Sequence, residues 1–157
     1  MKKTGIPNVI VSFVILFIAS PFCNGQDLKD TEKKAQDTTG IYIDGQYLGQ
    51  SRHTYTDEPY WGNIRVTIDK GIITRINFMI RDSNLHETFN GNYEKHFEGN
   101  ALYLQQCRND WNGVQAYPKK LIETQDINRV DAMSGATWSN NIFKASVKEA
   151  LKDVKKR

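Results

Sequence analysis

The stretch that decides the fold of this chain is Asn63-Ile-Arg-Val-Thr-Ile-Asp-Lys-Gly-Ile-Ile-Thr-Arg-Ile-Asn-Phe-Met-Ile80. Ile64, Val66 and Ile68 alternate with polar residues, which is typical of a strand with one buried and one solvated face. Asp69-Lys70-Gly71 supplies a turn, and residues 72–80 return as the next strand. We therefore predict an antiparallel hairpin in a sheet that has one wet face.

Upstream, a further hairpin is predicted within residues 41–51. Asp44-Gly45 is a dipeptide typical of hairpin turns, and Tyr42 and Tyr47 are among the β-formers on its two sides. Downstream, residues 81–117 show no clear period because glycines interrupt them, and only Ala101–Arg108 predicts a helical piece.

The C-terminal part of the chain is predicted to be mainly helical. After Pro118, residues 119–124 predict a short helix and residues 128–131 a brief strand. The closing helix has an apolar stripe at helical spacing, made of Ile142, Ala145, Val147, Ala150, Leu151 and Val154. Its expected cap is Ser139, Asn140 or Asn141. Hairpins followed by helices predict an α+β domain, in which helices pack on a small antiparallel sheet.

The N-terminus predicts export. Lys2 and Lys3 precede an apolar stretch at residues 9–19, followed by small or turn-forming residues up to Gly25, and this order is typical of a secretory signal peptide. A chain of 157 residues is long enough for one domain and too short for two ordinary ones. We therefore predict a signal peptide at 1–25, a polar tether at 26–39 and one folded domain at 40–157.

Two alternatives to a cleaved signal stay open. The apolar stretch is shorter than the roughly 20 residues of a spanning helix, which favours cleavage over a retained N-terminal anchor. Cys23 suggests a lipoprotein, although Ser20 and Phe22 depart from the usual lipidation motif. In each case the domain is expected in the periplasm or at the outer face of the cytoplasmic membrane.

Charge and composition exclude several classes of function. Loss of Lys2 and Lys3 with the signal lowers the formal net charge from +3 to +1, so we expect no nucleic-acid partner. The histidines have no metal-binding spacing, so no metal site is expected. Cys107 is left without a partner once Cys23 is removed, and we expect an inert thiol there. The usual glycine-rich nucleotide-binding motifs and the G-x-S-x-G hydrolase motif do not occur.

Ser134-Gly135-Ala136-Thr137 lies just before the closing helix. Free backbone N–H groups and the positive end of the helix dipole favour a phosphate at such a place, and small residues let the main chain approach it. The hydroxyls of Ser134, Thr137 and Ser139 add possible donors. The same residue types also serve as ordinary helix caps, so the residues alone leave both interpretations open.

This segment resembles a known signature. Asp131-Ala-Met-Ser-Gly-Ala-Thr137 is similar to the D-x-x-(S/T)-G-A-T sequence of the FMN-binding domain family, as in the C subunit of sodium-translocating NADH:quinone reductase and the G subunit of the Rnf complex. Further stretches resemble family motifs in the same order, namely residues 44–51, 66–74, 122–125 and 147–151, with His86-Glu87-Thr88 resembling a middle segment. The resemblance covers residues 40–151.

The resemblance implies a covalent flavin. A flavin transferase, with FAD as donor, would esterify the FMN phosphate to the hydroxyl of Thr137, which leaves the ring free to take electrons. Trp138 is a candidate to stack on that ring. The cofactor-binding residues that the resemblance and the helix start suggest are Asp131, Ser134, Gly135, Ala136, Thr137, Trp138 and Ser139.

The function that follows is an electron relay for a membrane or periplasmic redox partner, rather than a stand-alone enzyme. No catalytic residue is predicted. Two alternatives stay open: a noncovalent flavin- or ligand-binding module, and a non-redox interaction domain in which S-G-A-T is only a cap.

Overall fold

The computed structural model describes residues 40–54 and 57–155. The signal peptide, the tether and Cys23 lie outside the described residues, so their assignments stay predictions. Among the described residues, no helix combines the length and the apolar character that crossing a bilayer requires.

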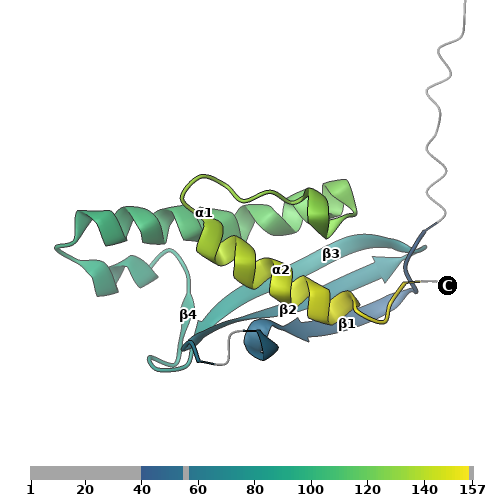
Figure 1. Cartoon of the computed structure of the whole chain (residues 1–157), viewed down its shortest axis with the longest axis horizontal. Coiled ribbons are helices and arrows are strands. Elements are labelled where there is room, and N and C mark those ends of the chain that lie inside the picture. The colour runs from purple at the N-terminus through teal and green to yellow at the C-terminus, as the bar shows by residue number, and fades with distance from the viewer. Residues whose placement is uncertain (1–39, 55–56, 156–157) are drawn as a thin grey trace, which may run out of the picture. The chain divides into compact units, whose positions relative to one another are not determined.

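A four-stranded antiparallel sheet with the order β1-β2-β3-β4 forms one layer (Figure 1). The strands are β1 Gly45–Gln50, β2 Tyr60–Asp69, β3 Ile72–Asp82 and β4 Glu87–Phe89. The predicted central hairpin is confirmed as β2 and β3. Lys70 and Gly71 turn it with φ angles of 53° and 76°, and two positive φ values match the twist of the flanking strands.

The predicted first hairpin is wrong. Gly45 opens β1, which pairs along β2 instead of folding back on residues 41–44. Tyr42 forms a single bridge with Lys155 near the other end of the chain. Asp44 stabilises the central turn, because its Oδ1 accepts a hydrogen bond from Gly71 N at 2.7 Å. The dipeptide therefore supports a turn elsewhere rather than making its own.

The middle of the chain forms one long helix, α1 Ala101–Thr124. The predicted piece at 101–108 is its start and the short helix at 119–124 is its end, since neither Gly113 nor Pro118 interrupts it. Asn100 caps the start by accepting from Tyr103 N at 3.2 Å. The strand predicted at 128–131 is wrong, because a 3-10 turn, η3 Ile127–Arg129, occupies that place.

The closing helix is α2 Thr137–Leu151, as predicted in type. It starts earlier than its predicted caps, so Ser139, Asn140 and Asn141 lie inside it and Ala136 is the N-cap residue. Val154 lies beyond its end, although it is buried. The hydrogen bond from Asn140 N to Ala136 O closes the first turn at 3.1 Å.

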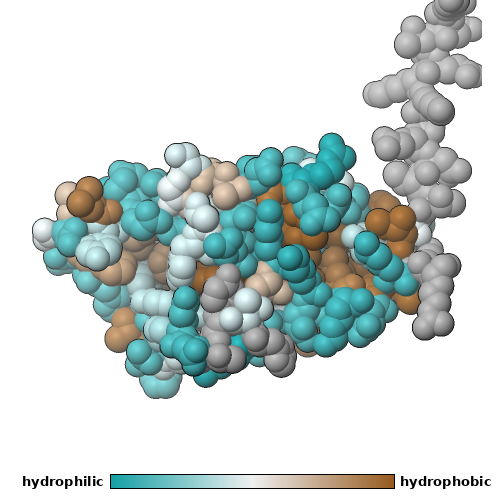
Figure 2. Space-filling model, viewed as in Figure 1, coloured by the Kyte–Doolittle hydropathy of each residue, from teal (hydrophilic) through white to brown (hydrophobic). Residues whose placement is uncertain are grey.

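Both helices cover the same face of the sheet, which confirms the α+β class (Figure 1). The buried strand residues that face them include Ile64, Val66, Ile73 and Ile80. Leu48 and Met79 on the other face are exposed, as expected for a sheet with one wet face. Hydrophilic residues predominate on the side of the domain drawn in Figure 2, where apolar residues form separate patches.

Candidate functional site

The S-G-A-T segment forms the entry to α2. Ser134 and Gly135 are exposed, Ala136 is buried, and Thr137 is an exposed residue at the first helical position. Gly135 has a φ of 72°, and a Cβ there would lie 2.4 Å from Asn109 Nδ2. The left-handed backbone favours glycine at this position, and a Cβ would also require the side chain of Asn109 to move.

Asp110 of α1 caps α2 from outside. Its Oδ1 accepts from Ser139 N at 3.1 Å and from Ser139 Oγ at 2.7 Å, and both side chains are buried. Gln106 Nε2 donates to Asp110 Oδ2 at 2.6 Å and to Gly135 O at 2.7 Å. The hydroxyl of Ser139 is therefore engaged inside the protein. Within the described part of the chain, the backbone N–H groups of Thr137 and Trp138 have no partner.

Tyr117 holds the loop before the helix. Its hydroxyl donates to Ala136 O at 2.8 Å and accepts from Met133 N at 3.2 Å. Burial raises the pKa of Tyr117, so the hydroxyl keeps the proton that it donates. Together with Gln106 and Asp110, this side chain fixes the position of Thr137 from α1. Asp131, by contrast, is exposed at the start of the loop.

An aromatic cavity of about 310 Å³ lies next to this helix start. Trp138 is on its wall, and its ring makes edge-to-face contacts with Tyr60 and Phe89 at centroid distances of 5.3 Å. The size and the largely apolar lining are those of small-molecule sites. The lining residues are Tyr60, Phe89, Tyr93, Phe97, Tyr103, Gln106, Cys107, Asp110 and Trp138.

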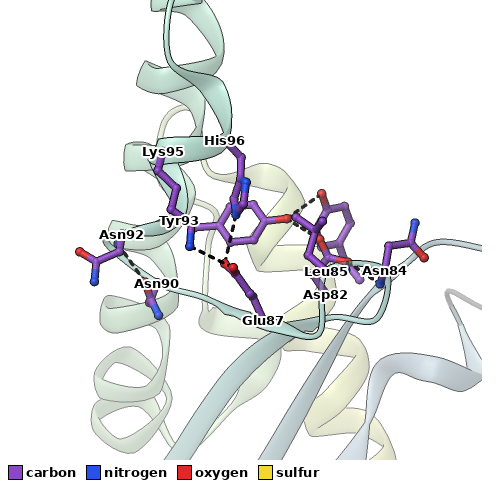
Figure 3. Close-up of polar contacts among 10 residues, drawn as sticks. Asp82, Asn84, Leu85, Glu87, Asn90, Asn92, Tyr93, Lys95 and His96 are labelled. Atoms are coloured by element: carbon purple, nitrogen blue, oxygen red, sulfur yellow. Dashed lines mark hydrogen bonds and ion pairs between the residues drawn. The ribbon is translucent and has the colours of Figure 1, made fainter.

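One wall of the cavity is backed by a polar chain (Figure 3). Tyr60 and Tyr93 hydroxyls are 3.2 Å apart, and Tyr93 Oη is 2.5 Å from Oδ2 of Asp82. Asp82 is buried, and its Oδ1 also accepts from Asn84 N and Leu85 N at 2.8 and 3.1 Å. Burial, followed by the hydrogen bond to Asp82, strongly raises the pKa of Tyr93.

The segment around His86 lies beside the cavity. Phe89 of β4 reaches the cavity wall, while Glu87 points to the surface and pairs with Lys95 at 2.9 Å and His96 at 3.0 Å (Figure 3). The hydrogen bond from His96, and then that from Lys95, lowers the pKa of Glu87. This pair of contacts ties β4 to the 3-10 helix η2 Tyr93–Phe97.

Cys107 is a buried free thiol on the cavity wall. Burial, with smaller contributions from Glu94 and Asp110, raises its pKa, so the thiol stays protonated at neutral pH. No group of metal-ligating side chains occurs in the part of the chain that the structure describes.

Sequence reasoning missed most of the cavity. Tyr103, Gln106, Cys107 and Asp110 follow helical spacing and would have been placed on one face if the long helix had been predicted. The residues from β2, β4 and η2 carry no such local signal. Of the predicted site residues, the structure brings Trp138 to the cavity and leaves Thr137 exposed directly before it.

The fold and the site define a class: an α+β domain with an exposed hydroxyl at a helix start beside an aromatic cavity. The model of the FMN-binding domain matches residues 60–152, which is more than half of the chain. The chain therefore belongs to the FMN-binding domain family, and it is an FMN-binding flavoprotein.

A solved structure shows the same fold. The CPE2226 protein from Clostridium perfringens superposes with a TM-score of 0.53 at 22% identity, covering 72% of this chain and 88% of that one. No curated protein matches the chain.

Proposed function

We propose that this chain is an exported electron-transfer flavoprotein that carries FMN as a phosphoester on Thr137. The observation that supports this most directly is the exposure of Thr137 at the first position of α2, next to Trp138 on the cavity wall. A flavin attached there through its phosphate could place its ring in the aromatic cavity without unfolding any element.

The residues present fit the parts of FMN. The free N–H groups of Thr137 and Trp138 lie at the positive end of the α2 dipole and would hold the phosphate. Ser139 would act indirectly, because Asp110 engages its hydroxyl. Six aromatic side chains would contact the ring. Bound FMN supplies reversible one- and two-electron chemistry, while this chain orients it and limits its contact with water.

The ester would form by transfer from FAD. The Thr137 oxygen attacks the FMN phosphorus, the bond to the AMP phosphate breaks, AMP leaves and the hydroxyl proton is released. A flavin transferase would catalyse this step and would use the exposed Asp131, with Ser134, Gly135 and Ala136, as its recognition sequence. The loaded protein would then relay electrons to a membrane or periplasmic redox partner, at the outer face of the cytoplasmic membrane or in the periplasm.

The test is the mass of the protein exported from a host that contains an active flavin transferase. We expect the mass of the chain plus FMN minus water, located on the peptide that contains Thr137. Thr137→Ala should give the unmodified mass with unchanged stability, because the Thr137 side chain makes no hydrogen bond among the described residues. Thr137→Ser keeps an oxygen nucleophile and should be partly labelled. Asp131→Ala should reduce labelling.

Colour separates the alternatives. A yellow protein whose colour survives denaturation supports the ester, and colour lost on denaturation supports noncovalent binding. Colourless, unmodified wild-type protein, made beside a transferase that labels another substrate, would overturn the proposal in favour of an interaction domain.

A further inference from the structure

The polar chain behind the cavity begins at the buried carboxyl group of Asp82, whose two oxygens both accept hydrogen bonds. Asp82 is 3% exposed, and two backbone N–H groups donate to its Oδ1. The hydroxyl of Tyr93 donates to the other carboxyl oxygen, Oδ2. The hydrogen bond between Tyr93 and Asp82 Oδ2 therefore has one direction, with Tyr93 as the donor.

The direction of this hydrogen bond determines the direction of the next one, between Tyr93 and Tyr60 at the cavity wall. A tyrosine hydroxyl has a single proton, and that of Tyr93 is committed to Asp82. In the 3.2 Å contact between the two tyrosines, Tyr60 must then be the donor. The oxygen of Tyr60 keeps only acceptor capacity. Since Tyr60 lines the cavity, its hydroxyl presents an acceptor and not a donor to a ligand that reaches it.

We propose that Tyr60 selects a ligand ring with an N–H group at its edge, and that it accepts the hydrogen bond of the imide N–H of oxidised flavin. This inference rests on the proposed placement of the flavin ring in the aromatic cavity. Oxidised isoalloxazine has only that one ring N–H, whereas its other polar edge atoms accept. A hydroxyl that was free to rotate could donate to those atoms. Asp82 and Tyr93 therefore act as positioning residues, because they direct the Tyr60 proton away from the ligand and leave its oxygen as an acceptor.

The experiment compares two probes on the unmodified full chain. Riboflavin carries the imide N–H, and 3-methylriboflavin has a methyl group in its place; neither has a phosphate, so the Thr137 ester plays no part. Dissociation constants come from the quenching of flavin fluorescence. Wild type should bind riboflavin at least about three- to tenfold more tightly than the methylated probe, which corresponds to one hydrogen bond.

Tyr60→Phe should weaken riboflavin binding by about three- to tenfold and reduce the preference over the methylated probe by the same factor. Tyr93→Phe leaves the Tyr60 oxygen in place but frees its proton, so the preference should also shrink. Tyr47→Phe is the control, because it removes a tyrosine hydroxyl outside the cavity, where Tyr47 Oη donates to Ile43 O at 3.0 Å. It should leave the preference unchanged.

The outcomes separate this inference from the proposed function. The role of Tyr60 is overturned if wild type binds both probes tightly and with equal affinity. It is also overturned if the preference for riboflavin survives in Tyr60→Phe. Either result still supports a flavin ring in the cavity. If wild type binds neither probe, both the proposed placement of the flavin ring in the cavity and the role of Tyr60 are overturned. If Tyr60→Phe does not fold, the probe preference of wild type relative to Tyr93→Phe decides the same point.

Discussion

At the scale of single residues, the site depends on polar side chains that are buried and fully engaged. Asp110 holds the start of α2, and Asp82 holds Tyr93. Buried polar groups of this kind are costly to leave without partners, so their removal should affect folding as well as ligand binding.

Because of Tyr93, the stability of the domain should decrease as the pH rises in the alkaline range. Its pKa is raised in the folded state, so the unfolded chain loses this proton first as pH rises. The stabilisation is complete below about pH 10, the pKa of an unperturbed tyrosine, and decreases above it by at most about 1.4 kcal/mol per pH unit. Tyr93→Phe should be less stable than wild type at pH 8 and should lose less stability between pH 8 and 11.

Urea unfolding across this pH range measures the effect. Tyr42 and Tyr117 also have raised pKa values, so part of the alkaline decrease should persist in the variant. Tyr103→Phe, at an exposed position, should reproduce the wild-type profile. Identical slopes for wild type and Tyr93→Phe would contradict the prediction.

At the scale of elements, α1 connects the site to the core. One end supplies the cavity residues Tyr103 and Cys107, the middle caps α2 through Asp110, and the far end is tied to β3 by Gln125. A break at Gly113 or Pro118 would separate the cavity residues of α1 from the end of the helix that Gln125 ties to β3.

Gly113 sets the approach of α1 to α2. A Cβ at this position would lie 2.7 Å from Tyr117 Cε2 and 2.8 Å from Ser139 Oγ, and both side chains are fully buried. Gly113→Ala should lower the free energy of unfolding by about 1–3 kcal/mol, although alanine favours a helix more than glycine does. Asn112→Ala, on the exposed face of α1, is the control and should be neutral or slightly stabilising. Chemical denaturation of the three proteins decides the point, and a stabilised Gly113→Ala would refute it.

Gln125 joins the end of α1 to β3. Its side chain accepts from Ile73 N at 2.7 Å and donates to Ile73 O at 2.9 Å, from a backbone with a φ of 56°. Gln125→Ala should destabilise the domain by about 1–3 kcal/mol, because both backbone groups lose their partner. Gln125→Gly relieves the left-handed strain and should recover only part of this. Thermal unfolding, with the exposed Gln115→Ala as the unaffected reference, provides the measurement.

At the scale of the whole domain, the two ends of the described chain meet. Ile43 N donates to Val154 O at 2.8 Å, and Tyr42 pairs with Lys155. Val154 is buried in the same part of the core as Val66 and Val147. Val154→Ala should lower the free energy of unfolding by about 1–3 kcal/mol through the lost burial. Lys152→Ala, at an exposed position close by, should change it by less than about 0.5 kcal/mol. Equal effects in guanidinium unfolding would show that this end is not part of the core.

By itself, the sequence determined the β2–β3 hairpin, the closing helix, the α+β class and the S-G-A-T segment before that helix. These features depend on the alternation of apolar and polar residues, on turn residues and on helical spacing within short stretches, so the local sequence predicts them. Only the tertiary structure decided that Asp44-Gly45 supports a distant turn, that α1 continues through Gly113, and that Asp110 caps α2. It also assembled the aromatic cavity from five elements. The reason is physical: each of these choices is stabilised by burial and hydrogen bonds between residues far apart in the chain, and local propensity carries no information about such contacts.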